Sequence, residues 1–104
     1  MEPPGDGSCM TSPAFATFTT ALMHVARTVD MVIHAADVSD HQMAALVARR
    51  LRRHLATLDH ALRELDSAKH LEACSLLAGL AERITEREAL QELEPCRELL
   101  GRFR

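Results

Sequence analysis

The stretch from Pro13 to Ala36 carries only two full charges, Arg27 and Asp30. Its large apolar residues recur at alternating spacings of three and four, which is the pattern of a helix that buries one long seam. The members of this seam are Phe15, Phe18, Leu22, Val25, Val29, Val32 and Ala36. The pattern therefore predicts a long helix with one face in a core.

The face opposite this seam is also poor in charge. A helical face that water covers is normally rich in charged side chains. This face instead offers Thr17, Thr20, His24, Thr28 and Met31, with Arg27 as its formal charge. Threonine and methionine can pack on a partner helix at a modest cost of desolvation, whereas the guanidinium of Arg27 must reach the rim or find a carboxylate. We expect a partner to cover this side of the helix.

Capping signals predict the ends of the first two helices. Ser12 followed by Pro13 suits an N-cap and a first helical position, and the helix is expected to run to about Asp37. Ser39 and Gln42 form a capping-box pair that predicts the start of a second helix. The apolar stripe of that helix is Ala44, Val47, Leu51, Leu55, Leu58, Leu62 and Leu65.

Weaker signals divide the rest of the chain. Asp66 and Ser67 predict a break after Leu65, but no Gly or Pro enforces it, so a continuous helix stays open. A third helix is expected to carry Leu71 at its margin and then Ala73, Leu77, Leu80 and Ile84. Thr85 and Glu88 form a second capping box that predicts a short fourth helix with Leu90 and Leu93, and Pro95 predicts one more helical restart.

The composition agrees with helices and not with sheets. Apolar residues make up 47% of the 104 residues and aromatic residues only 3%, which favours helix packing by Leu, Ala and Val. The sequence predicts an all-α antiparallel bundle of three long helices plus one or two short C-terminal helices. Residues 13–100 form its single domain, residues 1–12 a flexible tail and residues 101–104 a frayed end.

The densest charge cluster is Arg49, Arg50, Arg52 and Arg53. Guanidinium groups pair with carboxylates and with phosphates, so an acidic partner helix or a nucleic acid could dock there. The net charge is −3, and no aromatic residues interleave with the arginines to stack bases. An acidic protein partner is therefore the preferred interpretation, and nucleic acid is the alternative.

No motif predicts catalysis, a cofactor or a metal. His34, Asp37, Asp40 and His41 come closest to a metal cluster, but helix-end chemistry explains both aspartates. Cys9, Cys74 and Cys96 lack paired spacing, so we expect reduced thiols in a cytoplasmic protein, with Cys74 buried as a small apolar residue. No apolar run is long enough to span a membrane, and the N-terminus does not resemble a signal peptide.

These observations lead to an expectation of function. The chain is predicted to be a non-catalytic interaction module, an adaptor or chaperone-like subunit, that forms a homodimer or binds a partner protein mainly through its first helix. The predicted partner-binding residues are Thr17, Thr20, His24, Thr28, Met31, Arg49, Arg52 and Arg53.

Overall fold

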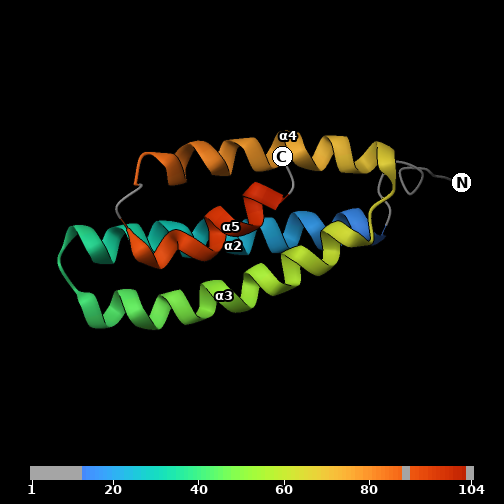
Figure 1. The fold of residues 1–104 in the computed structure, drawn as a ribbon. Coiled ribbons are helices and arrows are strands. Elements are labelled where there is room, and N and C mark those ends of the chain that lie inside the picture. The colour runs from blue at the N-terminus through green and yellow to red at the C-terminus, as the bar shows by residue number, and fades with distance from the viewer. Residues whose placement is uncertain (1–12, 88–89, 103–104) are drawn as a thin grey trace, which may run out of the picture.

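The computed structural model describes residues 13–87 and 90–102, and these residues form an all-α bundle. Its elements are α2 (Pro13–Asp37), α3 (His41–Arg63), α4 (Ser67–Thr85), the 3-10 turn η2 (Gln91–Leu93) and α5 (Glu94–Arg102). Each helix reverses the direction of the one before it, so that α3 runs antiparallel to α2 and to α4, and α5 lies along the bundle (Figure 1). The predicted fold class is confirmed.

The turn between α2 and α3 explains why α3 begins where it does. The amide of Asp40 donates to the carbonyl of Ala35 at 2.8 Å and that of Ser39 donates to Ala36 at 3.0 Å, a Schellman arrangement with Ser39 at φ 59°. The Asp40 carboxylate then accepts from the amide of Met43 at 3.0 Å and caps α3. Asp40, and not the predicted Ser39, is therefore the N-cap.

The predicted break between α3 and α4 is confirmed, and Asp66 is the N-cap of α4. Its carboxylate accepts from the amide of Lys69 at 2.9 Å and caps α4. The predicted second capping box is wrong, because Thr85 ends α4 and its hydroxyl donates to the Ala81 carbonyl at 2.8 Å. The predicted fourth helix is reduced to η2, and α5 then restarts at Glu94 and Pro95 as predicted.

Some predictions fall partly on residues that the structure does not describe. The predicted tail 1–12, with Ser12 and Cys9, lies outside the described residues, and so does Glu88. The predicted frayed segment 101–104 overlaps α5, which continues through Gly101 and Arg102.

The core of the bundle is wider on α2 than the predicted seam. Phe18, Val25, Val29 and Val32 are fully buried as predicted, while Phe15, Leu22 and Ala36 are only partly buried. The buried arc includes three further small residues spaced seven apart, Ala21, Thr28 and Ala35. Because α2 packs against α3 on one side and α4 on the other, it needs a broad buried face.

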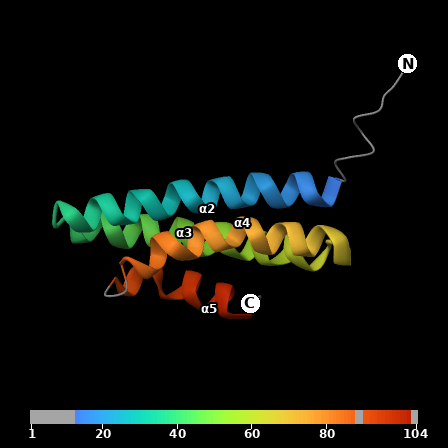
Figure 2. The same cartoon turned by 90° about the horizontal axis from the view of Figure 1, so that it is seen from above.

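The four helices form four seams. Figure 2 shows α2 and α5 at opposite sides of the bundle with α3 and α4 between them, and the molecule measures 53 × 26 × 19 Å. Ion pairs hold the α2–α4 seam: Asp30 lies 3.2 Å from Arg83, and Asp37 lies 3.0 Å from Arg87, just beyond α4. The other three seams, α2–α3, α3–α5 and α4–α5, differ in their charged and apolar side chains and are compared below as candidate binding surfaces.

Candidate interaction surface

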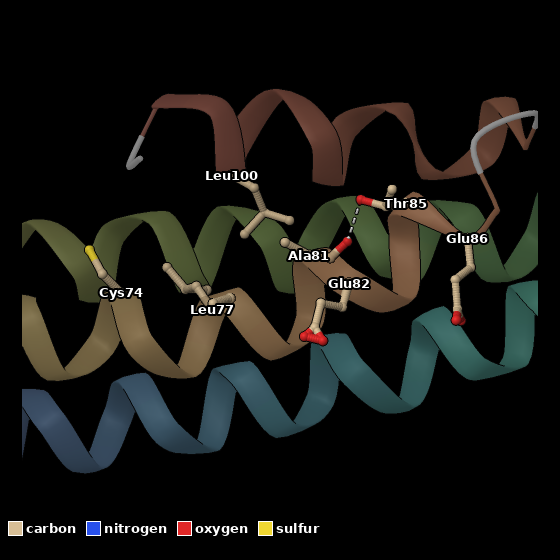
Figure 3. Close-up of a pocket in the computed structure, with 8 residues that line it drawn as sticks. Cys74, Leu77, Ala81, Glu82, Thr85, Glu86 and Leu100 are labelled. Carbon is tan, nitrogen blue, oxygen red and sulfur yellow. Dashed lines mark hydrogen bonds between the residues drawn. The ribbon is translucent and has the colours of Figure 1, made fainter.

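Two of the remaining seams mix charges or expose carboxylates. At the α3–α5 seam, Arg52 and Asp59 of α3 face Glu98 and Arg102 of α5 across a shallow hollow. The α4–α5 seam contains a hollow of about 700 Å³. Figure 3 shows its lining side chains on α4 and Leu100 of α5. Its lining comprises Cys74, Leu77, Ala78, Ala81, Glu82, Thr85, Glu86 and Leu100.

The α2–α3 seam differs from the others because its outward-facing stripes carry no described carboxylate from Thr20 to Met31 on α2 or from Leu46 to Thr57 on α3. At its α3–α4 end, Glu64 and Asp66 line a hollow together with Thr17. We call the outer surface of this seam the α2–α3 face and define it by helical register, taking residues spaced three or four apart on each helix. Its members are Thr17, Thr20, His24, Arg27 and Met31 of α2 and Leu46, Arg50, Arg53, His54 and Thr57 of α3. All are exposed except His54, which is partly buried.

Contacts between the helices confirm that these two stripes adjoin. The imidazole rings of His24 and His54 lie with centroids 5.1 Å apart at an interplanar angle of 52°. Thr17, Thr20 and His24 of α2 share a shallow hollow of about 350 Å³ with Thr57 of α3. The two helices therefore form one continuous surface with a groove between them.

The centre of the α2–α3 face is positively charged. Arg27, Arg50 and Arg53 form no salt bridge with any residue in the described part of the chain, whereas Arg63, Arg83, Arg87 and Arg97 each have a carboxylate within 4.0 Å. The pKa of His54 is lowered, first by burial and then by the neighbouring His24, Arg53 and Arg50. The three arginines thus concentrate positive potential at the centre of the α2–α3 face, with no described carboxylate within salt-bridge distance of them.

The end of the face next to the α2–α3 turn is apolar. Met31 is 45% exposed and Leu46 is 56% exposed, although both are large apolar side chains. Met43 at the start of α3 and Val38 in the turn are also exposed. A large apolar side chain left in water gains free energy when a partner covers it.

The structure divides the predicted partner-binding residues. Thr17, Thr20, His24, Met31 and Arg53 lie together on the α2–α3 face. The remaining three lie elsewhere: Thr28 in the core, Arg49 on the outer edge of α3 and Arg52 at the seam with α5.

Thr28 is a correction to the predicted surface. It is only 5% exposed, and its hydroxyl donates to the carbonyl of His24 at 2.6 Å. Because this bond satisfies the hydroxyl within its own helix, Thr28 can be buried against α3 at little cost. It is therefore not available to a partner.

Sequence reasoning missed most of the α3 half of the face. Leu46, Arg50, Arg53 and Thr57 recur at spacings of four, three and four, which is a helical stripe like that of α2. The sequence does not show that this stripe lies beside the stripe of α2. The contact between His54 and His24 in the folded structure sets the register of α3 against α2 and so brings the two stripes together.

Other candidate chemistry has little support in the described residues. No three His, Cys, Asp or Glu side chains among them gather closely enough to hold a metal ion. Asp37 and Asp40 of the predicted turn cluster instead pair with Arg87 and cap α3. None of the described helices combines the length and apolar character needed to cross a bilayer.

The two described cysteines are free thiols in different surroundings. Cys96 is fully buried, and burial raises the pKa of its thiol to about 12. Cys74 is only partly buried, contrary to prediction, and its Sγ lies 3.9 Å from Nδ1 of His70. At neutral pH the Cys96 thiol is therefore protonated and unreactive.

Comparisons with protein-family models, with curated proteins and with solved structures found no match to this chain.

Proposed function

We propose that this chain is a non-catalytic protein–protein interaction module, an adaptor or chaperone-like subunit of the cytoplasm, that binds a partner through the α2–α3 face. The observation that carries the proposal is the make-up of that face. It combines exposed Met31 and Leu46 with three arginines that have no described ion-pair partner, and no described carboxylate lies among them. Apolar side chains next to unpaired arginines are typical of protein interfaces.

The shape of the surface favours a helical partner. Two antiparallel helices leave a groove between their side-chain ridges, and a third helix can lie in such a groove. Thr17, Thr20 and Thr57 line one part of it and are small enough to allow close approach. Free thiols at Cys74 and Cys96 agree with a reducing compartment such as the cytoplasm.

Site-specific photo-crosslinking tests this proposal. A photoreactive amino acid replaces Met31 in one variant of the full chain and Thr20 in another, and each variant is irradiated in the cells that express it. Because both positions are exposed on the α2–α3 face, we expect a discrete crosslink to a protein from each.

The matched controls carry the same amino acid at Ser75 or Leu76 of α4. Leu76 is 44% exposed, close to the 45% of Met31, but lies off the α2–α3 face. Adding Thr20→Trp to the variant with the photoreactive residue at position 31 should sharply reduce its crosslink, because Thr20 lines the hollow between α2 and α3. Equal crosslinking from α4 and from the α2–α3 face would contradict the proposal.

The second candidate is a nucleic-acid-binding function through the arginines. The unpaired guanidiniums of Arg27, Arg50 and Arg53, with exposed Arg49 beside them, favour it. Such binding would weaken steeply as salt rises, because each phosphate contact releases counterions. A crosslink from Met31 to nucleic acid rather than to protein would select this alternative.

A further inference from the structure

Resting on the proposed function, we infer that the partner of the α2–α3 face is an acidic amphipathic helix of another protein. Its apolar side would cover Met31 and Leu46, and its carboxylates would pair with Arg27, Arg50 and Arg53. The inference adds to the proposed function the chemical class of the partner.

Charge complementarity is the first argument. Three exposed arginines offer positive charge to a partner along the face: Arg27, Arg50 and Arg53. Covering unpaired guanidiniums with an uncharged or basic surface would strip their water without compensation, whereas carboxylates pair with them in bidentate geometry. A partner that buries this face must therefore bring acidic groups.

The order of chemistry along the face is the second argument. Apolar Met31 and Leu46 lie toward the α2–α3 turn, Arg27 and Arg50 follow, and Thr20 and Thr57 lie beyond. From Thr17 to Met31 the face spans about 21 Å, the length of about four helical turns. A partner helix of that length with leucines toward one end and glutamates along its middle matches this order. The unbranched methionine can adapt to the partner's side chains.

A second copy of this chain fits the face poorly. A two-fold dimer places the same patch of both copies together, so that Arg27, Arg50 and Arg53 would meet their own counterparts. Like charges in contact disfavour that arrangement. A copy could instead offer Glu82 and Glu86 of its α4–α5 seam, but such head-to-tail contact produces rings or open chains.

Nucleic acid also fits less well. Phosphates would satisfy the arginines but leave Met31 and Leu46 uncovered. The described phenylalanine rings are not on this face: Phe18 is fully buried, and the ring of Phe15 packs 5.8 Å from it, with Lys69 above. Single-stranded nucleic acid usually stacks its bases on exposed aromatic side chains.

The experiment measures binding of the full chain to three fluorescent probes by anisotropy. The first is an 18-residue helical peptide with leucines toward one end and glutamates along its middle, all on one side of the helix, and the second has lysine at every glutamate position. The third is a 20-nucleotide DNA, single-stranded or duplex. We expect the acidic peptide to bind at least about tenfold more tightly than the lysine peptide, with affinity falling as salt rises.

Charge reversal on the face provides the decisive variant. Arg50→Glu with Arg53→Glu should weaken binding of the acidic peptide by about tenfold or more and should create affinity for the lysine peptide. The gain for the second probe excludes unfolding as the cause. The matched control is Arg52→Glu with Arg102→Glu, which makes the same change in net charge at the α3–α5 seam and should leave both affinities nearly unchanged.

Each contrary result has a definite meaning. Equal binding of the two peptides, no binding of the acidic peptide, or an equal loss in the control pair overturns the inference. Tighter binding of DNA than of the acidic peptide overturns it in favour of nucleic acid, and a salt-resistant dimer by light scattering overturns it in favour of a second copy. If the peptide results are contrary but the photoreactive amino acid at position 31 still crosslinks to a protein, the inference that the partner is acidic is wrong and the proposed function stands.

Discussion

The imidazole rings of His24 and His54, contributed by two antiparallel helices, lie with their centroids 5.1 Å apart. Burial lowers the pKa of His54 most, and the neighbouring His24, Arg53 and Arg50 lower it further. The folded structure therefore disfavours protonation of His54, which lies on the α2–α3 face.

Stability should therefore fall in mild acid. Because the pKa of His54 is lower in the folded chain than its ordinary value of 6.5, the unfolded chain binds the proton more readily. The free energy of unfolding should decrease as the pH falls through about 6.5 and should level off below the folded-state pKa. Urea denaturation from pH 8 to pH 5 measures this, and His54→Gln should flatten the slope.

The exposed His60 on the same helix supplies the control. His60→Gln should leave the pH dependence close to that of the unaltered chain. If both variants changed the slope equally, the His24–His54 pair would not be the origin of the acid sensitivity.

The α2–α3 turn predicts opposite effects for neighbouring residues. Asp40→Ala removes the N-cap of α3 and should cost about 1 kcal/mol. Ser39→Gly should stabilise the chain by about 0.5–1 kcal/mol, because glycine adopts the positive φ of this position without a steric penalty. Chemical denaturation compares them, and Ser39→Ala should be nearly neutral. A cost for Ser39→Ala as large as that for Asp40→Ala would restore Ser39 as the cap.

Gly79 lies in the middle of α4, and a Cβ added there would meet no atom within 4 Å. Gly79→Ala should therefore raise the free energy of unfolding by about 0.5–1 kcal/mol through helix propensity and reduced freedom of the unfolded chain. Thermal and urea denaturation check this. Gly101→Ala, in the last turn of α5, should gain less, because helix ends are frayed. A loss of stability at position 79 would reveal a packing contact on that side of α4.

The thiol of Cys96 should be inert while the bundle is folded. In a Cys9→Ser, Cys74→Ser background, its burial and pKa of about 12 should prevent reaction with DTNB until guanidinium unfolds the chain. The counterpart variant Cys9→Ser, Cys96→Ser retains the partly exposed Cys74 and should react in the native state. Fast native labelling of Cys96 would mean that α5 readily detaches.

The fold followed from signals that are local in the sequence. Apolar spacing and the residues Pro13, Asp66 and Pro95 were sufficient to predict the three long helices and the restart at α5, but not the 3-10 turn η2 that replaces the predicted fourth helix. The wrong cap at Ser39 has a backbone origin, since Ser39 and Asp40 can both cap a helix by side-chain chemistry. The choice depends on α2 ending with Ser39 at positive φ, which no local pattern specifies.

The candidate surface was only half predictable, because it is a property of two helices. The α2 side chains Thr17, Thr20 and Met31 were identified from one helix, but Thr28 was misplaced because α2 buries a broader arc against two neighbours. The contribution of Arg50 was missed since it depends on the register of α3 against α2.

The short α5 gives the bundle two unequal ends. With nine residues against the nineteen of α4, α5 lies beside only part of its neighbour, and at the opposite end Leu71 is 77% exposed (Figure 1). Amide hydrogen exchange should therefore be graded along the long axis, slowest where Leu93 and Cys96 close the core and fastest near the α3–α4 turn. Opening of the molecule would start near the α3–α4 turn, where α5 no longer covers the other three helices.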